Sequence, residues 1–347
     1  MGTKGMKNFI SLFRIAAVGL IVSLGLPWGL TGVSQAADIE WRMATKQPAD
    51  SEEGQAFQRF ADKVAEFSDG RMEVKVFPNE QLGKTEAILE QVQAGTVHLY
   101  PEGAAYLAKW VDDIKYASAP FMFESREHWA EFMKGDLFKK WLAEIEEKSG
   151  VTILGDPAAY MRGPYRVMVT KKPWSTLDEM QHVKLRMHPN QLAADVWTHL
   201  GAEVRTLGWT EVYSSIKQGI VEAVNSPIGL VEAMKFYEVA PHIIRHNEYP
   251  QGIAFIMNAK AYHDLPDDLK DAVNRAYKAG GDYSIELSEA TLADQMARMK
   301  AKGVTYSEPD LTAIHDSMKE FYRKREESGE MPEGFLDAVE ASRPNKS

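Results

Sequence analysis

The chain contains no cysteine among its 347 residues. Disulfide bonds, thiolate metal sites and a lipid-modified N-terminal cysteine are therefore excluded. Common catalytic signatures are also missing. There is no G-x-S-x-G, no P-loop and no G-x-G-x-x-G, and the nine histidines never take the H-E-x-x-H spacing. We therefore expect no catalytic residue, no cofactor and no metal site.

Long apolar runs are scarce, and the only notable one lies near the N-terminus. Lys4, Lys7 and Arg14 precede an apolar stretch over residues 15–26, and no acidic residue occurs before Asp38. Small residues follow at positions 34, 36 and 37. This pattern is typical of a secretory signal peptide. A membrane anchor is the alternative, but the stretch is shorter than the roughly 20 residues that a spanning helix needs. We expect residues 1–36 to be removed and the protein to reach the periplasm.

Acidic residues outnumber basic ones, 50 to 40, which gives a formal net charge of −10. Removing a segment with three positive charges and no negative ones leaves −13 for the mature protein. Such a surface argues against nucleic acid and anionic lipid as partners. The 311 residues that remain (347 minus 36) exceed one typical core and favour two domains.

Strand and helix patterns alternate along the chain. Period-two or continuous apolar runs predict strands at 38–44, 72–76, 151–154, 165–170, 183–187 and 253–258. Helical periodicity predicts helices at 57–69, 84–94, 129–145 with a break near Gly135, 191–200, 210–218, 266–300 and 311–327. The alternation indicates an α/β protein with mostly parallel sheets.

Several short motifs occur in a fixed order. The central ones are Val183–Met187 (V-K-L-R-M), Leu200–Ala202 (L-G-A), Trp209–Tyr213 (W-T-E-V-Y) and Gln218–Pro227 (Q-G-I-V-E-A-V-N-S-P). Supporting ones are Gln81–Gly83, Pro120–Phe123, Lys235–Val239 and Leu265–Leu269. Together they resemble the substrate-binding subunits of TRAP (tripartite ATP-independent periplasmic) transporters, the DctP family. The resemblance covers nearly all of the mature chain.

The resemblance assigns roles to individual residues. Arg186, in the family's K-[IL]-R motif, would grip a ligand carboxylate, and Arg166, twenty residues earlier, would be a second grip. Trp209 would line the pocket. The family asparagine of E-N-P falls on Ser226, with Asn225 just before it, so this sequence departs from the pattern there.

Physical chemistry supports the arginines independently. A guanidinium offers a planar fork of donors that matches a carboxylate, and it stays charged at any relevant pH. The alternative for Arg186 and Arg166 is an internal ion pair. Tyr213 fits the core as well as the site. Glu102 could accept from a ligand or cap a helix.

The fold that the resemblance implies is a two-lobed α/β periplasmic binding protein with a long interlobe helix. Lobe I would comprise residues 37–162 and 251–289. Lobe II would comprise 163–250 and 290–341, the latter with the C-terminal helices, and 342–347 would be a tail. The expected partners are a small organic anion and the small and large TRAP membrane subunits, with the binding protein a monomer.

The ligand class stays broad at this point: a dicarboxylate, 2-oxo acid, sugar acid or aromatic acid, or a sulfonate. Two other functions remain open. The first is a binding protein of another transporter class, such as an ATP-driven one, although the K-L-R motif argues against it. The second is a periplasmic hydrolase with two distant carboxylates.

Export gives the first testable prediction. Mass spectrometry of the periplasmic protein should find an N-terminus near Ala37, because the small residue at position 36 fits the cleavage rule. An intact Met1 in that fraction would refute cleavage.

Overall fold

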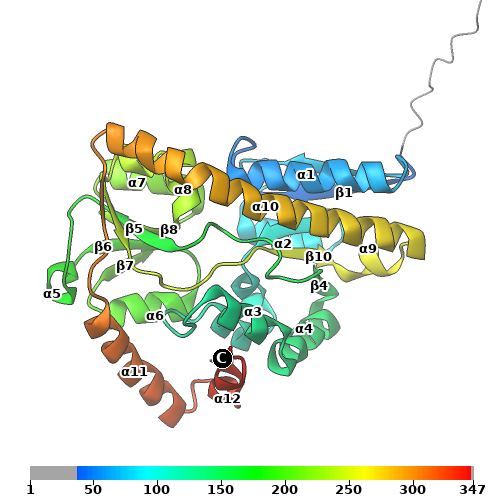
Figure 1. The fold of residues 1–347 in the computed structure, drawn as a ribbon. Helices are drawn as coiled ribbons and strands as arrows, with labels where there is room; N and C mark the ends of the chain where they lie inside the picture. Colours follow the sequence, from blue (N-terminus) through cyan, green and yellow to red (C-terminus); the bar gives the residue numbers. More distant parts are fainter. Residues whose placement is uncertain (1–36, 345–347) are drawn as a thin grey trace, which may run out of the picture. The chain divides into compact units, whose positions relative to one another are not determined.

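The computed structural model describes residues 37–344, so the predicted signal peptide lies outside the described residues. The described part folds into two sheets with helices packed around them (Figure 1). No helix within this part is both long and apolar enough to cross a membrane.

The first sheet has five strands. In spatial order they are β2 (Met72–Phe77), β1 (Ile39–Ala44), β3 (Leu99–Glu102), β10 (Ala254–Asn258) and β4 (Val151–Leu154). The second sheet has six strands. Their order is β11 (Thr305–Ser307), β9 (His242–Arg245), β5 (Arg166–Thr170), β8 (Ala223–Pro227), β6 (Lys184–Met187) and β7 (Glu203–Thr206).

Helices connect the strands and cover the sheets. They are α1 (Glu52–Phe67), α2 (Thr85–Gln93), α3 (Arg126–Lys134), α4 (Asp136–Ser149), α5 (Leu177–Met180), α6 (Gln191–His199), α7 (Val212–Lys217), α8 (Ile228–Ala233), α9 (Ala259–His263), α10 (Asp267–Ala301), α11 (Thr312–Glu327) and α12 (Phe335–Ala341). Short 3-10 helices span Ala104–Lys109 (η1), Asp112–Ser118 (η2), Trp209–Glu211 (η3) and Phe236–Glu238 (η4). The predicted break at Gly135 is confirmed, since α3 ends and α4 begins around it.

Both sheets are mixed, and the expected majority of parallel pairings is a narrow one. Five strand pairings are parallel and four are antiparallel. The antiparallel pairings all involve β5 or β10. Each is the first strand that the chain forms after passing from one sheet to the other. Each of these two strands begins at the edge of its sheet where the neighbouring strands end, and it therefore runs antiparallel to them.

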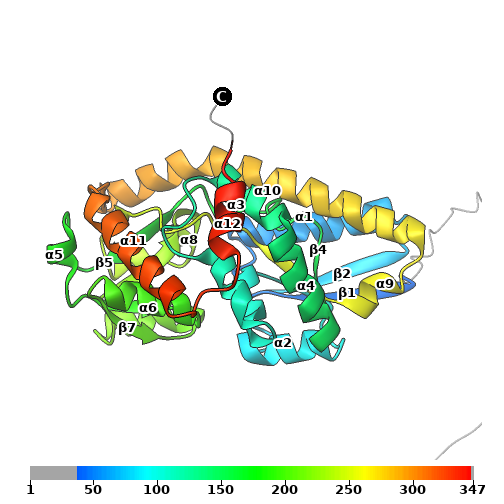
Figure 2. The ribbon, with the colours of Figure 1, turned by 90° about the horizontal axis from the view of Figure 1, so that it is seen from below.

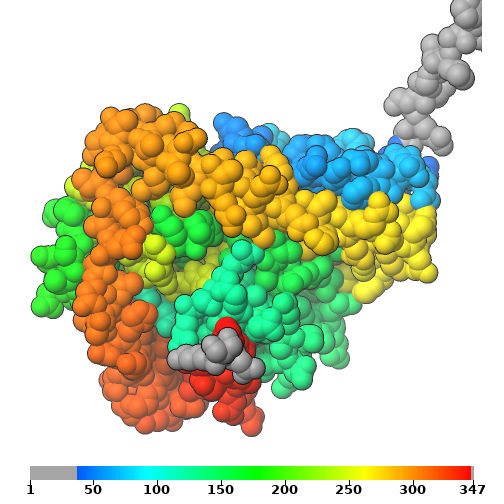
Figure 3. Space-filling model, in the orientation of Figure 1, coloured from blue at the N-terminus to red at the C-terminus, as the bar shows by residue number. Residues whose placement is uncertain are grey.

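Helix α10 is 35 residues long, roughly 50 Å at 1.5 Å per residue. Its first half packs with α1 in a core that includes Phe57, Phe255 and Tyr277. Its last turns place Met299 in the core of the second sheet. Figure 2 shows it running past both sheets, and in Figure 3 it forms a band beside α1. The predicted long helix joining both lobes is thus present, whereas the lobe limits at 162, 250 and 289 remain predictions.

Helix α12, assigned to the second lobe, packs on α3 through Phe335 and Phe132.

Two glycines let α10 pass close to the chain at Ala159 and Tyr160. A Cβ atom at Gly281 would lie 2.9 Å from the carbonyl oxygen of Ala159, and one at Gly280 would lie 2.0 Å from the Tyr160 hydroxyl. A backbone oxygen moves less easily than a side chain, so the contact at Gly281 is the stricter of the two.

We expect Gly281→Ala to lower the free energy of unfolding by about 1–3 kcal/mol, because overpacking outweighs the better helix propensity of alanine. Urea unfolding would measure this. Glu286→Ala, at an exposed position of the same helix, is the control and should change stability by less than about 0.5 kcal/mol. Equal stability of Gly281→Ala and the unaltered protein would show that α10 can move away at no cost.

Candidate functional site

Strand ends from both sheets meet around one cavity of about 30 Å³. The first sheet contributes residues that follow β1 and the end of β3. The second contributes the start of β5 and the ends of β6 and β8. The lining residues are Lys46, Gln47, Glu102, Tyr106, Arg162, Arg166, Arg186, His188, Trp209, Asn225, Pro227, Leu230 and Gln251. Ligands of α/β proteins commonly bind at the carboxyl ends of strands, which is where most of these residues lie.

Arg186, at the end of β6, is buried and has no acidic partner among the described residues. Its Nε and Nη2 donate to the carbonyl oxygen of Leu207, at 3.0 and 2.7 Å. Its guanidinium carbon lies 5.3 Å from the centre of the Trp209 ring, and its side chain is 3% exposed. Burial lowers the pKa of Arg186 to about 10, so the group remains charged at neutral pH. The internal ion pair considered as the alternative is therefore not present for this arginine.

Arg166, at the start of β5, does form an internal ion pair. Its Nε donates to Glu248 at 2.8 Å, its Nη1 donates to Gln251, and its guanidinium carbon lies 4.6 Å from the Tyr249 ring centre. Glu248 also accepts from the indole nitrogen of Trp197. Arg166 thus lines the cavity, but its charge is compensated by the protein.

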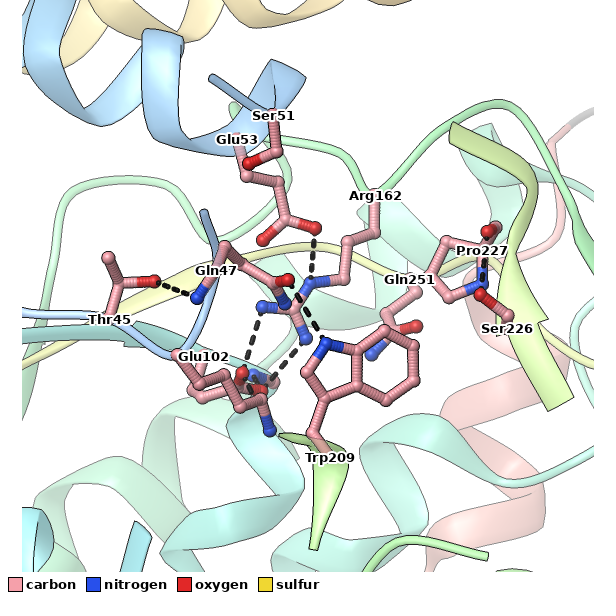
Figure 4. A network of polar contacts seen from close by, with 12 residues as sticks. Thr45, Gln47, Ser51, Glu53, Glu102, Arg162, Trp209, Ser226, Pro227 and Gln251 are labelled. Atoms are coloured by element: carbon pink, nitrogen blue, oxygen red, sulfur yellow. Dashed lines mark hydrogen bonds and ion pairs between the residues drawn. The ribbon is translucent and has the colours of Figure 1, made fainter. Parts of the chain in front are cut away.

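A buried chain of charges forms another wall of the cavity. Arg162 donates to both oxygens of Glu102 and to Glu53, each at 2.9 Å (Figure 4). Lys46 lies 3.0 Å from the same Glu102 carboxylate. Burial favours the neutral carboxyl, but Arg162 and Lys46 outweigh it and lower the pKa of Glu102. The acceptor capacity predicted for a ligand is therefore used by protein cations.

These contacts leave one positive charge without a partner. Four cations surround the cavity, namely Lys46, Arg162, Arg166 and Arg186. The carboxylates in contact with them are three, namely Glu53, Glu102 and Glu248. Four minus three gives a surplus of one, and the unpaired group is Arg186. His188 does not add to it, because burial and the nearby Arg186 lower its pKa well below the ordinary value.

Five of the seven predicted site residues line the cavity: Arg186, Arg166, Trp209, Asn225 and Glu102. Ser226 does not, because successive residues of a strand point to opposite faces, and Asn225 is the one that faces the cavity. The Ser226 hydroxyl donates to the carbonyl of Pro227 instead. Tyr213 lies away from the cavity, where its hydroxyl donates to Glu238 at 3.0 Å.

Sequence reasoning gave little weight to several lining residues. Lys46 and Gln47 follow β1, and His188 follows β6. Tyr106, in η1, also lines the cavity. A position just after the carboxyl end of a predicted strand was the signal available for the first three.

Contacts cross from one sheet to the other at the cavity rim. The Trp209 indole nitrogen donates to Gln47 at 3.2 Å, Thr210 donates to Glu80 at 2.7 Å, and Lys84 pairs with Glu211. Figure 4 shows Trp209 beside Gln47 and Arg162. The loop at Leu207–Glu211 is therefore held by Arg186 on one side and by the first sheet on the other.

Comparisons with known proteins agree with this architecture. The model of the bacterial extracellular solute-binding protein family 7, DctP, matches residues 43–328. A solute-binding protein of Roseobacter denitrificans is 27% identical over 262 residues, 76% of this chain and 79% of that protein. The C4-dicarboxylate-binding periplasmic protein DctP of Rhodobacter capsulatus is 25% identical over 318 residues, 88% of this chain and 92% of that protein.

Solved structures share the fold. A TRAP periplasmic solute-binding protein of R. denitrificans with bound L-galactonate has a TM-score of 0.78 at 24% identity, covering 89% of this chain and 99% of that one. The chain thus belongs to bacterial extracellular solute-binding protein family 7, the DctP family of periplasmic TRAP-transporter binding proteins, which are not enzymes.

Proposed function

We propose that this protein binds a hydroxylated monocarboxylate, a sugar acid, and presents it to the membrane subunits of a TRAP transporter. The observation that carries the proposal is Arg186, a buried cation that faces the cavity with no protein counter-charge. Burying a charge without a partner is costly, so a bound anion would relieve an existing cost. Its Nη1 has no hydrogen-bond partner among the described residues and is free for a carboxylate oxygen.

The count of charges favours one negative group on the ligand rather than two. A dicarboxylate would need a second unpaired cation in the cavity. Arg166 is neutralised by Glu248, and Lys46 and Arg162 share Glu102. A second ligand carboxylate would have to displace one of these buried pairs, and breaking such a pair typically costs about 3–5 kcal/mol.

Unused polar atoms favour hydroxyl groups on the ligand. The Oδ1 atom of Asn225 is buried and has no partner, so a hydroxyl that donates to it would satisfy it. The Nε2 atoms of Gln47 and Gln251 belong to cavity-lining side chains and have no partner among the described residues. They could donate to the oxygens of the same hydroxyls. The galactonate bound to the R. denitrificans protein is consistent with this class.

The cavity must change size for such a ligand. About 30 Å³ is enough for roughly two water molecules and too little for a six-carbon acid. The rim contacts at Gln47, Glu80 and Lys84 would therefore open and reform around the ligand. A ligand that contacts residues of both sheets stabilises the closed arrangement by its differential affinity for it.

The proposal is tested by thermal unfolding with a panel of acids at equal concentration. We expect galactonate and glucuronate to raise the melting temperature, because a ligand at a hundred times its Kd adds about 2.7 kcal/mol to stability. Succinate and malate should raise it less. A larger shift with a dicarboxylate, or with the sulfonate isethionate, would contradict the sugar-acid assignment, and no shift with any anion would contradict anion binding.

Arg186→Ala should weaken binding of the acid found in that panel roughly tenfold to a thousandfold, because its carboxylate would lose a buried charged partner. Calorimetric titration measures the change. Arg205→Ala is the matched control, since Arg205 lies opposite Arg186 in the β6–β7 register but is exposed and outside the cavity. Unchanged affinity in Arg186→Ala would refute the assignment.

The pH dependence of affinity should distinguish Arg186 from a lysine. Only the protonated guanidinium attracts an anion, so affinity is level below a pKa of about 10 and falls as pH rises through it. In Arg186→Lys the same burial would lower an ordinary pKa of about 10.4, so the fall begins at a lower pH. Titrations from pH 6 to 10 would show this. Parallel pH profiles of the two proteins would contradict it.

A further inference from the structure

A second cavity adjoins the first and differs from it in character. Its volume is about 20 Å³, and three side chains line both cavities, namely Tyr106, His188 and Gln251. No Lys, Arg, Asp or Glu lines the second cavity, whereas the first contains four cations and one carboxylate. The two spaces therefore lie side by side, one charged and one not.

The far wall of the second cavity is apolar and built from small residues. Ala105 of η1 and Ala117 of η2 leave room there, and Trp129 and Met133 of α3 close it. The polar groups of this wall are already engaged, and the polar atoms of the cavity that have no partner among the described residues, such as those of Tyr249 and Gln251, lie outside this wall. The Trp129 indole nitrogen donates to the carbonyl of Ala117 at 2.8 Å, and Ser118 is bonded to Lys115 and Asn190. Nothing on this wall favours a ligand hydroxyl.

The partition between the cavities is made by side chains from both sheets. Tyr106 comes from η1, which follows the first sheet's β3, and His188 follows β6 of the second. Their ring centres are 6.1 Å apart. Tyr106 is held by Lys46, whose Nζ donates to its hydroxyl at 3.1 Å. Because the partition is not built on one element, any separation of the two sheets also joins the two cavities.

We propose that the second cavity receives a short apolar end of the ligand, with Ala105 setting its length. This rests on the proposed function, because the carboxylate at Arg186 fixes the other end. The cavity is small, about 20 Å³ in this arrangement, and Trp129 and Met133 close it, so a short group such as methyl or ethyl fits against this wall. The favoured ligand is then a hydroxylated monocarboxylate that ends in an alkyl group, such as a 6-deoxy sugar acid.

The first test compares two ligands that differ only at the far end. 6-Deoxygalactonate should bind about tenfold or more tightly than galactonate in calorimetric titration of the unaltered protein, because a terminal hydroxyl placed against Ala105, Ala117 and Trp129 would lose its water and meet no free polar group of that wall. Equal affinities, or a preference for galactonate, would overturn the proposal while leaving sugar-acid binding intact. If neither acid binds, this proposal and the proposed function fail together.

The second test fills the cavity. Ala105→Leu should weaken binding of 6-deoxygalactonate at least tenfold and leave the binding of glycerate unchanged, because a three-carbon acid reaches only the first cavity. Ala108→Leu, on the same 3-10 helix but lining neither cavity, is the control and should alter neither affinity. The ligand-free melting temperatures verify folding. Equal weakening of both acids by Ala105→Leu, or no weakening of either, would overturn the proposal.

Discussion

The bidentate ion pair between Arg162 and Glu102 is the interaction on which the walls of the cavity depend. Glu102 is fully buried, and its two oxygens accept from Arg162, while Lys46 and the backbone nitrogen of Gly103 also contact it. Removing this carboxylate would leave Lys46 without a partner beside Arg186, because Arg162 would keep Glu53, and the surplus of one positive charge would become two. The pairing therefore fixes the wall geometry and keeps the surplus positive charge of the cavity at one.

The topology explains how residues from distant parts of the chain reach this network. Parallel strands of each sheet end at the cavity, so Lys46 follows β1, and Glu102 closes β3. The strands that enter from the opposite sheet begin there instead. Arg166 is the first residue of β5, and Arg162 lies on the same crossing. Because β5 and β10 run antiparallel to their neighbours, the segments that connect the two sheets lie beside the ends of the other strands.

The sequence predicted most helices and the strands with simple apolar patterns, such as β1 and β10. No strand was predicted at β3, β7, β9 or β11, and β8 lies within the Gln218–Pro227 motif, which was interpreted as a family signature. Arg186 was predictable because its motif places it at a strand end. The partner of Arg166 was not, because Glu248 is 82 residues away and pairs with it only across the folded sheet. Tyr213 was expected near the cavity, four residues after Trp209. Residues four apart lie on one face of a regular α-helix, but Trp209 belongs to a 3-10 turn that precedes α7, so Tyr213 faces another way.

Residues from the ends of both sheets line the binding region, and this would link specificity to closure. Trp209, in η3, stacks beside Arg186 of the second sheet and donates to Gln47, which follows β1 of the first. A carboxylate at Arg186 would therefore lie against the same loop that carries the rim contacts. The observed affinity of such a protein equals the intrinsic affinity of the closed form reduced by the fraction of molecules that close. In the proposed binding mode, rim side chains that do not touch the ligand, such as Lys84 and Glu211, would influence affinity for every ligand alike, whereas Asn225 and Ala105 would distinguish one ligand from another.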